Sequence, residues 1–382
     1  MDALTTPSNW QRVRLGDIAE IIGGGTPSTQ ITSFWNGSIN WFTPTEIGIT
    51  KYVHKSQRTI TPLGLKKSSA KLLPIGTILL TSRASIGDCA ILKMVATTNQ
   101  GFQSLIPLEK INNEFLYYLM LTLKNKLLEL ASGSTFLEIS PNKIKNLLIP
   151  LPPLNEQIAI ANILSDVDHY LYSLDALILK KESVKKALSF ELLSQRKRLK
   201  GFNQAWQRVR LGDILSYEQP TKYLVATTQY LQKGFTPILT AGKTFILGYT
   251  NDKHGIYTNI PIIIFDDFTT DSKMVNFPFK VKSSAIKILS LRDNNQADLK
   301  YIYEKLTLLK HQVTDHKRYW IDEFSNFEIP LPPLNEQAAI ANILSDLDNE
   351  IISLKNKKRQ FENIKKALNH DLMSAKIRVL NK

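Results

Sequence analysis

The sequence predicts an α+β protein in which two mixed α/β domains are separated by two long antiparallel coiled-coil helices, with an internal pseudo-twofold repeat. Three observations lead to this prediction. Residues 149–168 and 329–348 are identical at eighteen of twenty positions. The sequence WQRVRLGDI begins at Trp10 and again at Trp206. From the middle of each twenty-residue copy onward, apolar residues recur three and four positions apart, which is the spacing of a coiled-coil seam.

The repeats divide the chain into four expected segments. We expect the α/β domains at residues 1–151 and 202–331, and the helices at residues 152–201 and 332–382. The parts of the two domains between the repeats share almost no sequence, and the second is shorter by 16 residues. Constant joints around variable inserts suggest a scaffold that presents two different recognition surfaces.

Both α/β domains are predicted to begin with strands and to carry a helix late. In the first domain, Gly23-Gly24-Gly25 indicates a loop. The predicted strands and helices are listed here: strands 77–82, 89–94 and 103–106 with helix 114–131 in the first domain, and strands 237–240, 256–257, 262–265 and 285–289 with helix 298–310 in the second. The shared order indicates one fold whose sequence has diverged.

Each long helix follows a Pro-Pro pair and should span about 40 to 45 residues, which is roughly 60 to 67 Å at a rise of about 1.5 Å per residue. The prolines suit an extended entry, Asn155 can cap the first helix, and Gly201 can end it. The seam residues are Ile160, Leu164, Val167, Leu171, Leu174, Ile178, Val184, Leu188 and Leu192, and then Ile340, Leu344, Leu347, Ile351, Leu354, Phe361, Ile364, Leu368 and Leu372. Each helix begins acidic and ends basic, so antiparallel pairing places opposite charges together, although the same polarity also complements each helix dipole.

The composition favours a polyanionic partner. The chain has 382 residues, a net charge of +14 and a pI near 9.5. Its one cysteine, Cys89, excludes an internal disulfide and fits the reducing cytoplasm. No apolar run approaches the roughly 20 residues of a membrane span, so we expect no membrane partner.

Motifs for catalysis or cofactor binding are not found in the sequence. There is no P-loop, the triple glycine lacks dinucleotide-binding spacing, and the six histidines, His311 and His316 among them, are scattered. Asp266-Asp267 follows an apolar strand and leaves two alternatives open. The pair could hold a metal or act as a base, or one carboxylate could be structural while the other accepts from a cytosine amino group. We expect no catalytic residue and no metal in this chain.

Polar and basic side chains gather in the turns of both α/β domains, a composition that can contact phosphates and base edges. The candidate DNA-binding residues are Thr26, Ser28, Thr29, Lys66, Lys67, Ser68, Ser69, Arg83, Asn99 and Gln100 in the first domain, and Thr240, Lys243, Thr244, Tyr249, Thr269, Thr270 and Lys273 in the second. Arg83 follows a strand and could contact a base or a phosphate. Trp35 and Trp41 are better explained as core than as stacking platforms.

At these residues the chain resembles the DNA-specificity subunit of type I restriction-modification systems, over nearly its whole length. The resemblance is carried by the strings IPLPPLNEQ and W-x-x-x-x-L-G-D-I, which both occur twice. In the first domain it is carried also by GGTPST, GLKKSSAKLLPIGT, SRASIG, TNQGF and GSTFLEIS. In the second it is carried by TPILTAGKTFILGYT and FDDFTTDSKMVNFPFKVKSSA.

The resemblance implies two target recognition domains, each of which recognises one half of a split DNA sequence. The helices would set the spacer and bind two modification subunits, which carry S-adenosylmethionine and methylate adenine. Restriction subunits, which are motor-nucleases that use ATP and Mg²⁺, would join to cleave unmodified DNA. This chain itself would hold no cofactor and catalyse nothing. The implied partner-binding residues are Pro152, Pro153, Leu154, Glu156, Gln157, Pro332, Pro333, Leu334, Glu336 and Gln337.

Two other classes of protein are alternatives. One is a fragment of a single-chain restriction-modification enzyme or a stand-alone methyltransferase, which the lack of cofactor motifs disfavours. The other is a structural coiled-coil adaptor, which the two large, loop-rich domains disfavour. Binding of S-adenosylmethionine by the chain alone would distinguish an enzyme from a specificity subunit.

Overall fold

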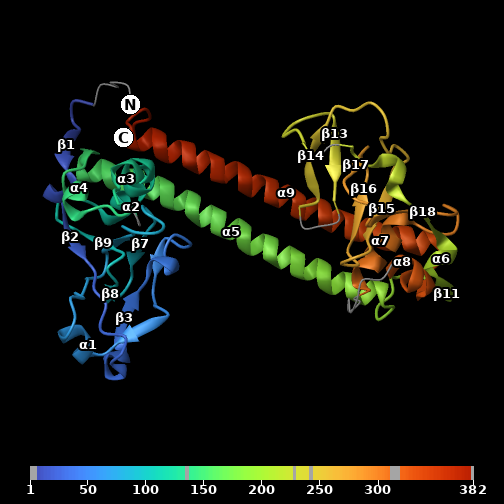
Figure 1. Ribbon diagram of the computed structural model, residues 1–382, viewed down its shortest axis with the longest axis horizontal. Coiled ribbons are helices and arrows are strands. Elements are labelled where there is room, and N and C mark those ends of the chain that lie inside the picture. Colours follow the sequence, from blue (N-terminus) through green and yellow to red (C-terminus); the bar gives the residue numbers. More distant parts are fainter. Residues whose placement is uncertain (1–6, 134–136, 227–228, 241–243, 310–318, 380–382) are drawn as a thin grey trace. The chain divides into compact units, whose positions relative to one another are not determined.

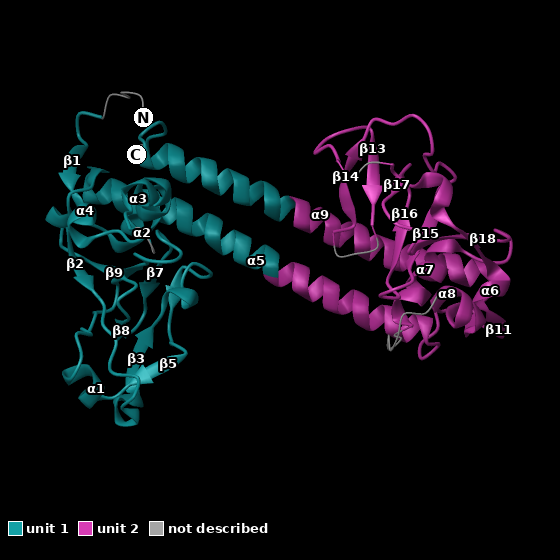
Figure 2. Ribbon diagram, viewed as in Figure 1, with its two compact units in different colours: residues 1–175, 357–382 teal, residues 176–356 magenta. Residues whose placement is uncertain are grey.

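The computed structural model describes residues 7–133, 137–226, 229–240, 244–309 and 319–379. The chain forms two compact units (Figure 1, Figure 2). Unit 1 comprises residues 1–175 and 357–382, and unit 2 comprises residues 176–356. Each unit combines one α/β domain with part of both long helices, α5 (Leu154–Leu193) and α9 (Leu334–Met373).

The repeated sequences at the two ends of each α/β domain pair with each other. In unit 1, β1 (Gln11–Arg14) is antiparallel to β10 (Leu148–Leu151). In unit 2, β11 (Gln207–Arg210) is antiparallel to β19 (Glu328–Leu331), in the same register. Each domain therefore begins and ends at a two-stranded ribbon that leads directly into a long helix.

The larger sheets of the two domains share one strand order. Unit 1 has the order β2-β9-β6-β7-β4, formed by β2 (Ala19–Gly23), β9 (Gln103–Pro107), β6 (Ile78–Leu80), β7 (Cys89–Leu92) and β4 (Tyr52–Val53). Unit 2 has the order β12-β18-β15-β16, formed by β12 (Leu215–Glu218), β18 (Ile286–Leu291), β15 (Ile262–Asp266) and β16 (Ser272–Val275). The first four strands pair antiparallel in both units, so β6 corresponds to β15 and β9 to β18.

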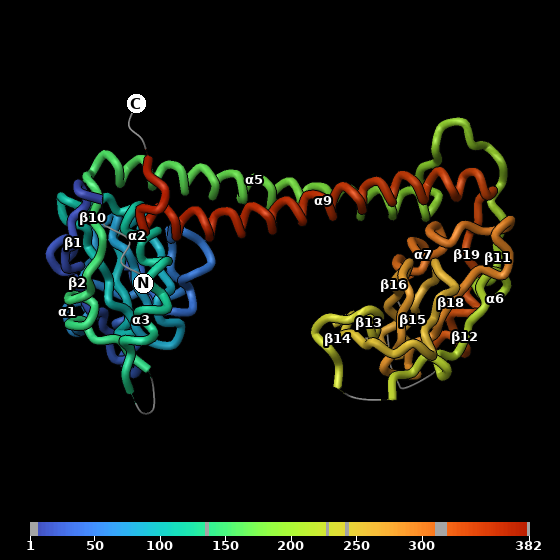
Figure 3. Tube along the Cα trace, turned by 90° about the horizontal axis from the view of Figure 1, so that it is seen from above, coloured from blue at the N-terminus to red at the C-terminus, as the bar shows by residue number. Residues whose placement is uncertain are grey.

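A smaller three-stranded sheet is also common to both domains. Unit 1 has β5-β3-β8, formed by β5 (Arg58–Ile60), β3 (Trp35–Phe42) and β8 (Ala96–Thr98). Unit 2 has β14-β13-β17, formed by β14 (Ile246–Thr250), β13 (Thr236–Leu239) and β17 (Lys280–Val281). In each, the middle strand has one antiparallel and one parallel neighbour. The predicted single fold for both domains is therefore confirmed. In Figure 3, β13 and β14 lie at the end of unit 2 away from β11 and β19.

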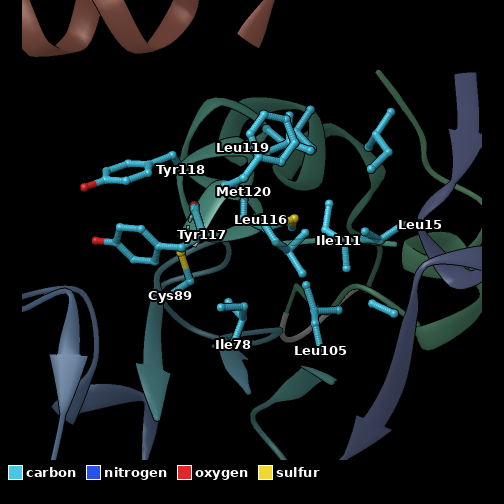
Figure 4. Close-up of a cluster of buried hydrophobic side chains, with 14 of the residues drawn as sticks. Leu15, Ile78, Cys89, Leu105, Ile111, Leu116, Tyr117, Tyr118, Leu119 and Met120 are labelled. Atoms are coloured by element: carbon cyan, nitrogen blue, oxygen red, sulfur yellow. Dashed lines mark hydrogen bonds between the residues drawn. The ribbon is translucent and has the colours of Figure 1, made fainter. Parts of the chain in front are cut away.

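A capped helix packs each larger sheet against the long helices. The N-cap side chains are Asn112 for α2 (Asn113–Thr122) and Asp298 for α7 (Leu299–Leu308). In unit 1, Leu116, Leu119 and Met120 of α2 lie in one buried cluster with Leu105 of the sheet (Figure 4). This cluster also includes Ile160 of α5 and Leu372 of α9, so the long helices contribute to the domain core. The remaining short helices are α1 (Pro62–Lys66), α3 (Lys124–Leu130), α4 (Pro141–Lys145), α6 (Leu211–Ile214) and α8 (Tyr319–Asp322), with 3-10 turns at Leu15–Asp17, Thr32–Phe34, Pro44–Glu46, Pro220–Tyr223 and Phe324–Asn326.

Within each unit the long helices run antiparallel, as predicted, and their charged ends meet. In unit 1, Lys358 pairs with Asp175 at 2.6 Å, and Lys365 pairs with Asp168. In unit 2, Lys185 lies 2.6 Å from Asp348 and Lys181 lies 2.7 Å from Glu350. Acidic residues near the start of one helix thus contact basic residues near the end of the other.

The capped helices bind the long helices through polar clusters whose residues differ between units. In unit 2, Lys300 of α7 lies 2.6 Å from Glu304 and 2.8 Å from Asp348. Although burial alone would raise the pKa of Asp348, hydrogen bonds from Lys185 and Lys300 hold it below its usual value. In unit 1, Tyr118 of α2 takes the place of Glu304 and donates its hydroxyl to Asp168 at 2.5 Å.

Several predicted details of the elements are wrong. The predicted helix 114–131 is two helices, because Leu123 leaves the helical hydrogen-bond pattern between α2 and α3. Residues 256–257 form no strand, and Tyr257 makes only an isolated bridge to Phe279. Helix α5 begins before Asn155 and ends eight residues before Gly201, so neither residue has the predicted capping role. Gln195, with a φ of 62°, is the left-handed residue that follows the helix. In the seam, Val184 and Ile364 are exposed.

Lys305 should make stability depend on pH. It is buried, donates to the main-chain oxygen of Leu193 at 2.5 Å, and burial lowers its pKa from 10.5 to about 8. Below pH 8 the amine is charged in both the folded and the unfolded chain, so the whole cost of burying a charge opposes folding. As pH rises from about 8 to 10.5, the folded chain loses the proton before the unfolded chain does, so the free energy of unfolding rises. Over this pH range the free energy of unfolding of the native chain should rise by up to about 3 kcal/mol relative to that of Lys305→Leu, at roughly 1.4 kcal/mol per pKa unit.

Urea unfolding of both proteins between pH 7 and 10.5 measures this difference, with exposed Lys282→Leu as the control. Leucine is a suitable replacement because Leu119 occupies the corresponding position of α2. A constant difference across the range would contradict the assigned pKa.

Candidate nucleic-acid interface

The glycine-rich loop after β2 is held in place by two buried tryptophans. Trp41 donates its indole N–H to the main-chain oxygen of Gly25 at 2.9 Å, and Trp35 donates to that of Ser28 at 3.0 Å. The two rings meet edge to face with centroids 5.0 Å apart. Both rings are buried, which confirms that they belong to the core. They fix the loop that carries the predicted residues Thr26, Ser28 and Thr29.

Three segments that are distant in sequence meet at this loop. A Cβ atom added to Gly24 would lie 1.9 Å from the main-chain oxygen of Asn99, and one added to Gly25 would lie 2.3 Å from Ser69 Oγ. The hydroxyl of Thr26 also donates to Gln100. The structure therefore brings together Thr26, Ser69, Asn99 and Gln100, four of the predicted DNA-binding residues.

Arg83 lies beside the same group of residues. The preceding residue, Ser82, donates its main-chain N–H to Gly101 at 2.7 Å, which places Arg83 next to the Asn99–Gln100 turn. Its guanidinium forms an ion pair of 2.9 Å with Glu138, and both side chains are partly exposed. The remaining predicted residues of unit 1 are exposed or half-buried at two nearby loops: Ser28 and Thr29 before β3, and Lys66, Lys67 and Ser68 at the end of α1.

In unit 2 the predicted residues lie on two hairpins. Thr240 follows β13, Thr244 precedes β14, and Tyr249 lies within β14, where it pairs with Leu231. Thr269 and Thr270 form the turn between β15 and β16. Lys273 of β16 joins the hairpins, because its Nζ lies 4.5 Å from the centre of the Phe245 ring. Lys243 lies outside the described residues.

Asp266 and Asp267 both have partners inside the domain, which confirms that one carboxylate is structural and corrects the expectation that the other is available to a cytosine amino group. Both are buried. Asp266 accepts from the Phe268 N–H at 2.9 Å and from the Thr269 hydroxyl at 2.6 Å. Asp267 forms a buried ion pair of 2.8 Å with Lys287. Among the described residues no group of His, Cys, Asp and Glu could hold a metal; His311 and His316 lie outside this part of the chain.

Four side chains at this interface were not predicted from the sequence. Glu138 lies 55 positions from Arg83, and no local pattern indicates the pair. The exposed Arg58 stacks over Trp35, with its guanidinium carbon 3.8 Å from the ring centre. In unit 2, Phe235 is 91% exposed and Phe268 is 54% exposed, both in loops beside predicted residues. For the two phenylalanines, the signal available in the sequence was an aromatic residue in a predicted loop that carries threonine and lysine.

The repeated glutamates are the centres of two equivalent internal clusters. In unit 1, the buried carboxylate of Glu156 accepts from Trp10 Nε1 at 3.0 Å and from Arg378 Nε at 2.8 Å. In unit 2, Glu336 accepts from Trp206 Nε1 at 3.0 Å and from Arg198 Nε at 3.1 Å. We call each set a Trp–Glu–Arg cluster. Arg198 and Arg378 are separated by 180 positions, the same offset as the proline repeats, which is the sequence signal that was missed.

The repeated glutamines are buried beside these clusters. Gln157 accepts from the Asn112 main-chain N–H at 2.8 Å and donates to the oxygens of Lys110 and Pro152. Gln337 makes the corresponding bonds to Asp298, Gln296 and Pro332. We therefore correct the prediction that Glu156, Gln157, Glu336 and Gln337 contact a partner, because their polar atoms are used inside the chain. Pro152 and Pro332 are buried as well, whereas Pro153, Leu154, Pro333 and Leu334 remain accessible and stay predictions.

Each unit also presents an uncharged helix face, which begins at an accessible leucine. Spacings of three, four and seven residues place its members on one side of the helix. The uncharged helix face consists of Leu154, Ile158, Ser165, His169 and Tyr172 in unit 1, and of the equivalent Leu334, Ala338, Ser345, Asn349 and Ile352 in unit 2. Tyr172 is 77% exposed and Ile352 is 55% exposed. Large apolar side chains that repeat at equivalent exposed positions are typical of a binding surface.

Comparison with known proteins gives one family. Residues 7–181 and 203–363 match the family Methylase_S, described as "Type I restriction modification DNA specificity domain". The chain belongs to this family. It is 30% identical over 418 aligned residues to the type I restriction enzyme MjaIX specificity subunit of Methanocaldococcus jannaschii, covering 98% of this chain and 94% of that one. It is 47% identical over 166 residues to the EcoR124I/EcoR124II specificity subunit of Escherichia coli, covering 42% of this chain and 39% of the relative.

Solved structures share the fold. The S subunit of a type I restriction-modification system from M. genitalium has a TM-score of 0.62 at 19% identity, and the match covers 97% of both chains. The HsdS subunit from Thermoanaerobacter tengcongensis has a TM-score of 0.53 at 18% identity, with coverage of 97% of this chain and 98% of the other. Within the described part of the chain, no helix has the length and apolarity needed to cross a membrane.

The Trp–Glu–Arg cluster should contribute strongly to folding stability. In Glu156→Ala, the indole N–H of Trp10 loses its acceptor and Arg378 loses its counter-charge. We expect a loss of about 2–4 kcal/mol in the free energy of unfolding, below the loss for a fully buried pair because Arg378 is partly exposed. Urea unfolding measures it, and the exposed Asp166→Ala on the same helix should change stability by less than about 0.5 kcal/mol. Unchanged stability in Glu156→Ala would contradict the structural role of the cluster.

Proposed function

We propose that this chain is the sequence-specific DNA-binding subunit of a type I restriction-modification complex, in which each α/β domain recognises one half of a bipartite target. One observation carries the proposal: the two domains share strand order and joints, yet differ in the residues that their loops expose. A protein that recognises two unlike DNA sequences requires this combination of equal scaffolds and unlike contact surfaces. The net charge of +14 suits a DNA partner.

We propose that the uncharged helix faces bind two modification subunits, one on each unit. The two faces start in the repeated segment, where the exposed Leu154 recurs as the exposed Leu334. Exposed residues have no packing requirement that would keep them equal in both copies. Equal exposed residues therefore indicate that the same kind of partner binds twice.

In this assignment the chain itself is not an enzyme. S-adenosylmethionine would be bound by the modification subunits, which methylate adenine, and ATP and Mg²⁺ by the restriction subunits, which cleave unmodified DNA. The long helices would set the spacer between the half-sites. The place of action would be the cytoplasm, where chromosomal and incoming DNA are accessible.

Exchanging one domain should change one half-site. We expect replacement of residues 25–148 by the equivalent segment of another family member to alter one half of the methylated motif. The other half and the spacer should stay the same, because the Trp–Glu–Arg cluster and all of the β1–β10 ribbon except Leu148 lie outside the exchanged segment. Adenine methylome sequencing of cells that express the complex gives the motif. The reciprocal exchange in unit 2 is the control, and alteration of both half-sites by one exchange would contradict modular recognition.

Lengthening both helices together should lengthen the spacer. Four residues inserted after Asp175 and four after Lys357 leave the ion pairs on either side in register, including Lys358 with Asp175 and Lys185 with Asp348. The insertion adds about 6 Å and about one full turn of helix. At 3.4 Å per base pair this should add about two base pairs to the spacer of the methylated motif, with both half-sites unchanged.

The same insertion in α5 alone is the control, because it breaks the register of the antiparallel pair and should abolish methylation. Full activity of the double insertion with an unchanged spacer would show that the helices do not set the distance.

A further inference from the structure

Equivalent loops follow the corresponding strands β6 and β15 in the two units. In unit 1 the loop begins at Thr81, whose main-chain N–H donates to the oxygen of Asp88 at 2.9 Å. In unit 2 the equivalent residue is Asp266, the last of β15, whose N–H donates to the oxygen of Asp271 at 2.9 Å. The next residue also has the same bond in both: Ser82 N–H donates to Gly101 at 2.7 Å, and Asp267 N–H donates to Ala285 at 3.1 Å. The residue after that is Arg83 in unit 1 and Phe268 in unit 2, which we call the apex residues.

Internal hydrogen bonds hold the backbone of both loops. The hydroxyl of Thr81 donates to the Ser85 oxygen at 2.6 Å and accepts from the Asp88 N–H at 3.0 Å. The carboxylate of Asp266 accepts from Phe268 N–H and from the Thr269 hydroxyl. Ala84 and Thr270, which lie just after the apex residues, have φ values of 57° and 60°. A fixed backbone gives each apex side chain a defined starting point, as discrimination between bases requires.

The ion pair of Arg83 distinguishes base contact from phosphate contact. Glu138 holds the guanidinium at 2.9 Å, and the two side chains remain 43% and 35% exposed. A carboxylate at the DNA surface is repelled by phosphates, so this pair is unsuited to hold the DNA backbone. A guanidinium held in one orientation can donate to O6 and N7 of guanine, and the carboxylate beside it can accept from the N4 amino group of the paired cytosine.

Phe268 offers different chemistry at the same position. Its ring is 54% exposed, and the two following threonines add methyl groups beside it. Apolar side chains contact the C5 methyl group of thymine in the major groove.

We propose that the apex residue of this loop recognises one base pair in each half-site: Arg83, oriented by Glu138, recognises a G·C pair, and Phe268 recognises the thymine of an A·T pair. This inference rests on the proposed DNA-binding function. It assigns the contacts to single positions on equivalent loops, which the family membership does not provide.

The test uses the complex of this chain with its modification subunits and duplexes that contain its methylated motif. Replacing each guanine in turn by 7-deazaguanine removes N7, and replacing each thymine by uracil removes the methyl group. The native complex should lose about 3- to 10-fold in affinity at one guanine, because N7 is one of the two acceptors of the bidentate contact. Arg83→Ala should bind that duplex and the unmodified one equally well.

Glu138→Ala separates the two roles of Arg83. If Arg83 recognises the base, removal of the carboxylate should raise affinity for unrelated DNA and reduce discrimination at the same G·C position. If affinity rises for all sequences and discrimination is retained, Arg83 contacts phosphate and the proposal is overturned. The exposed Lys67→Ala in the same unit is the matched control and should weaken binding equally for all base variants.

The uracil series tests unit 2. One thymine in the other half-site should be sensitive in the native complex and insensitive in Phe268→Ala. Tyr217→Ala, which removes an exposed aromatic residue of β12 in the same unit, should keep the native sensitivity. If Phe268→Ala retains every native sensitivity, the assignment for unit 2 is overturned. A native complex that shows no preference for any bipartite sequence would instead contradict the proposed function, which keeps the two failures distinct.

Discussion

The structure depends on a buried carboxylate at the start of each long helix. Glu156 joins the first ribbon of its domain, through Trp10, to the segment after the other long helix, through Arg378. Glu336 makes the same connection through Trp206 and Arg198. A buried carboxylate is stable only with several donors, so the indole and the guanidinium must both be in place. Both copies meet this requirement with the same residues: the tryptophan of WQRVRLGDI, the glutamate of PLPPLNEQ and the arginine after each helix.

The recognition loops are subject to a weaker requirement. Their positions are fixed mainly by main-chain bonds, such as those of Ser82 to Gly101 and Asp267 to Ala285. Main-chain bonds do not depend on the side chains, so the two domains keep one strand order while sharing almost no sequence between their joints. Residues beneath the loops also differ: the buried Lys287 of the Asp267 ion pair stands where β9 has Gln103.

The sequence predicted the features that have strong local patterns. The repeats, the antiparallel helices and most buried strands follow from periodicity and charge. Strand β3 was missed, because Asn36 and Gly37 interrupt its apolar pattern. In unit 1, Thr26, Ser69, Asn99 and Gln100 were named as candidate DNA-binding residues, which stays a prediction, but the close approach of Gly24 and Gly25 that joins them is visible only in three dimensions. Glu156 was misassigned, because a repeated charged residue resembles a partner contact and its own partner Arg378 is 222 positions away.

The rigid backbone of the apex loops has a consequence for how such a protein can evolve. Arg83 and Phe268 are partly exposed and contribute little to the core, so exchanging them should leave the fold intact. A single nucleotide change in the gene could therefore alter which DNA a cell protects without first passing through an unstable intermediate. Selection on host defence would then act on these positions separately from selection on folding.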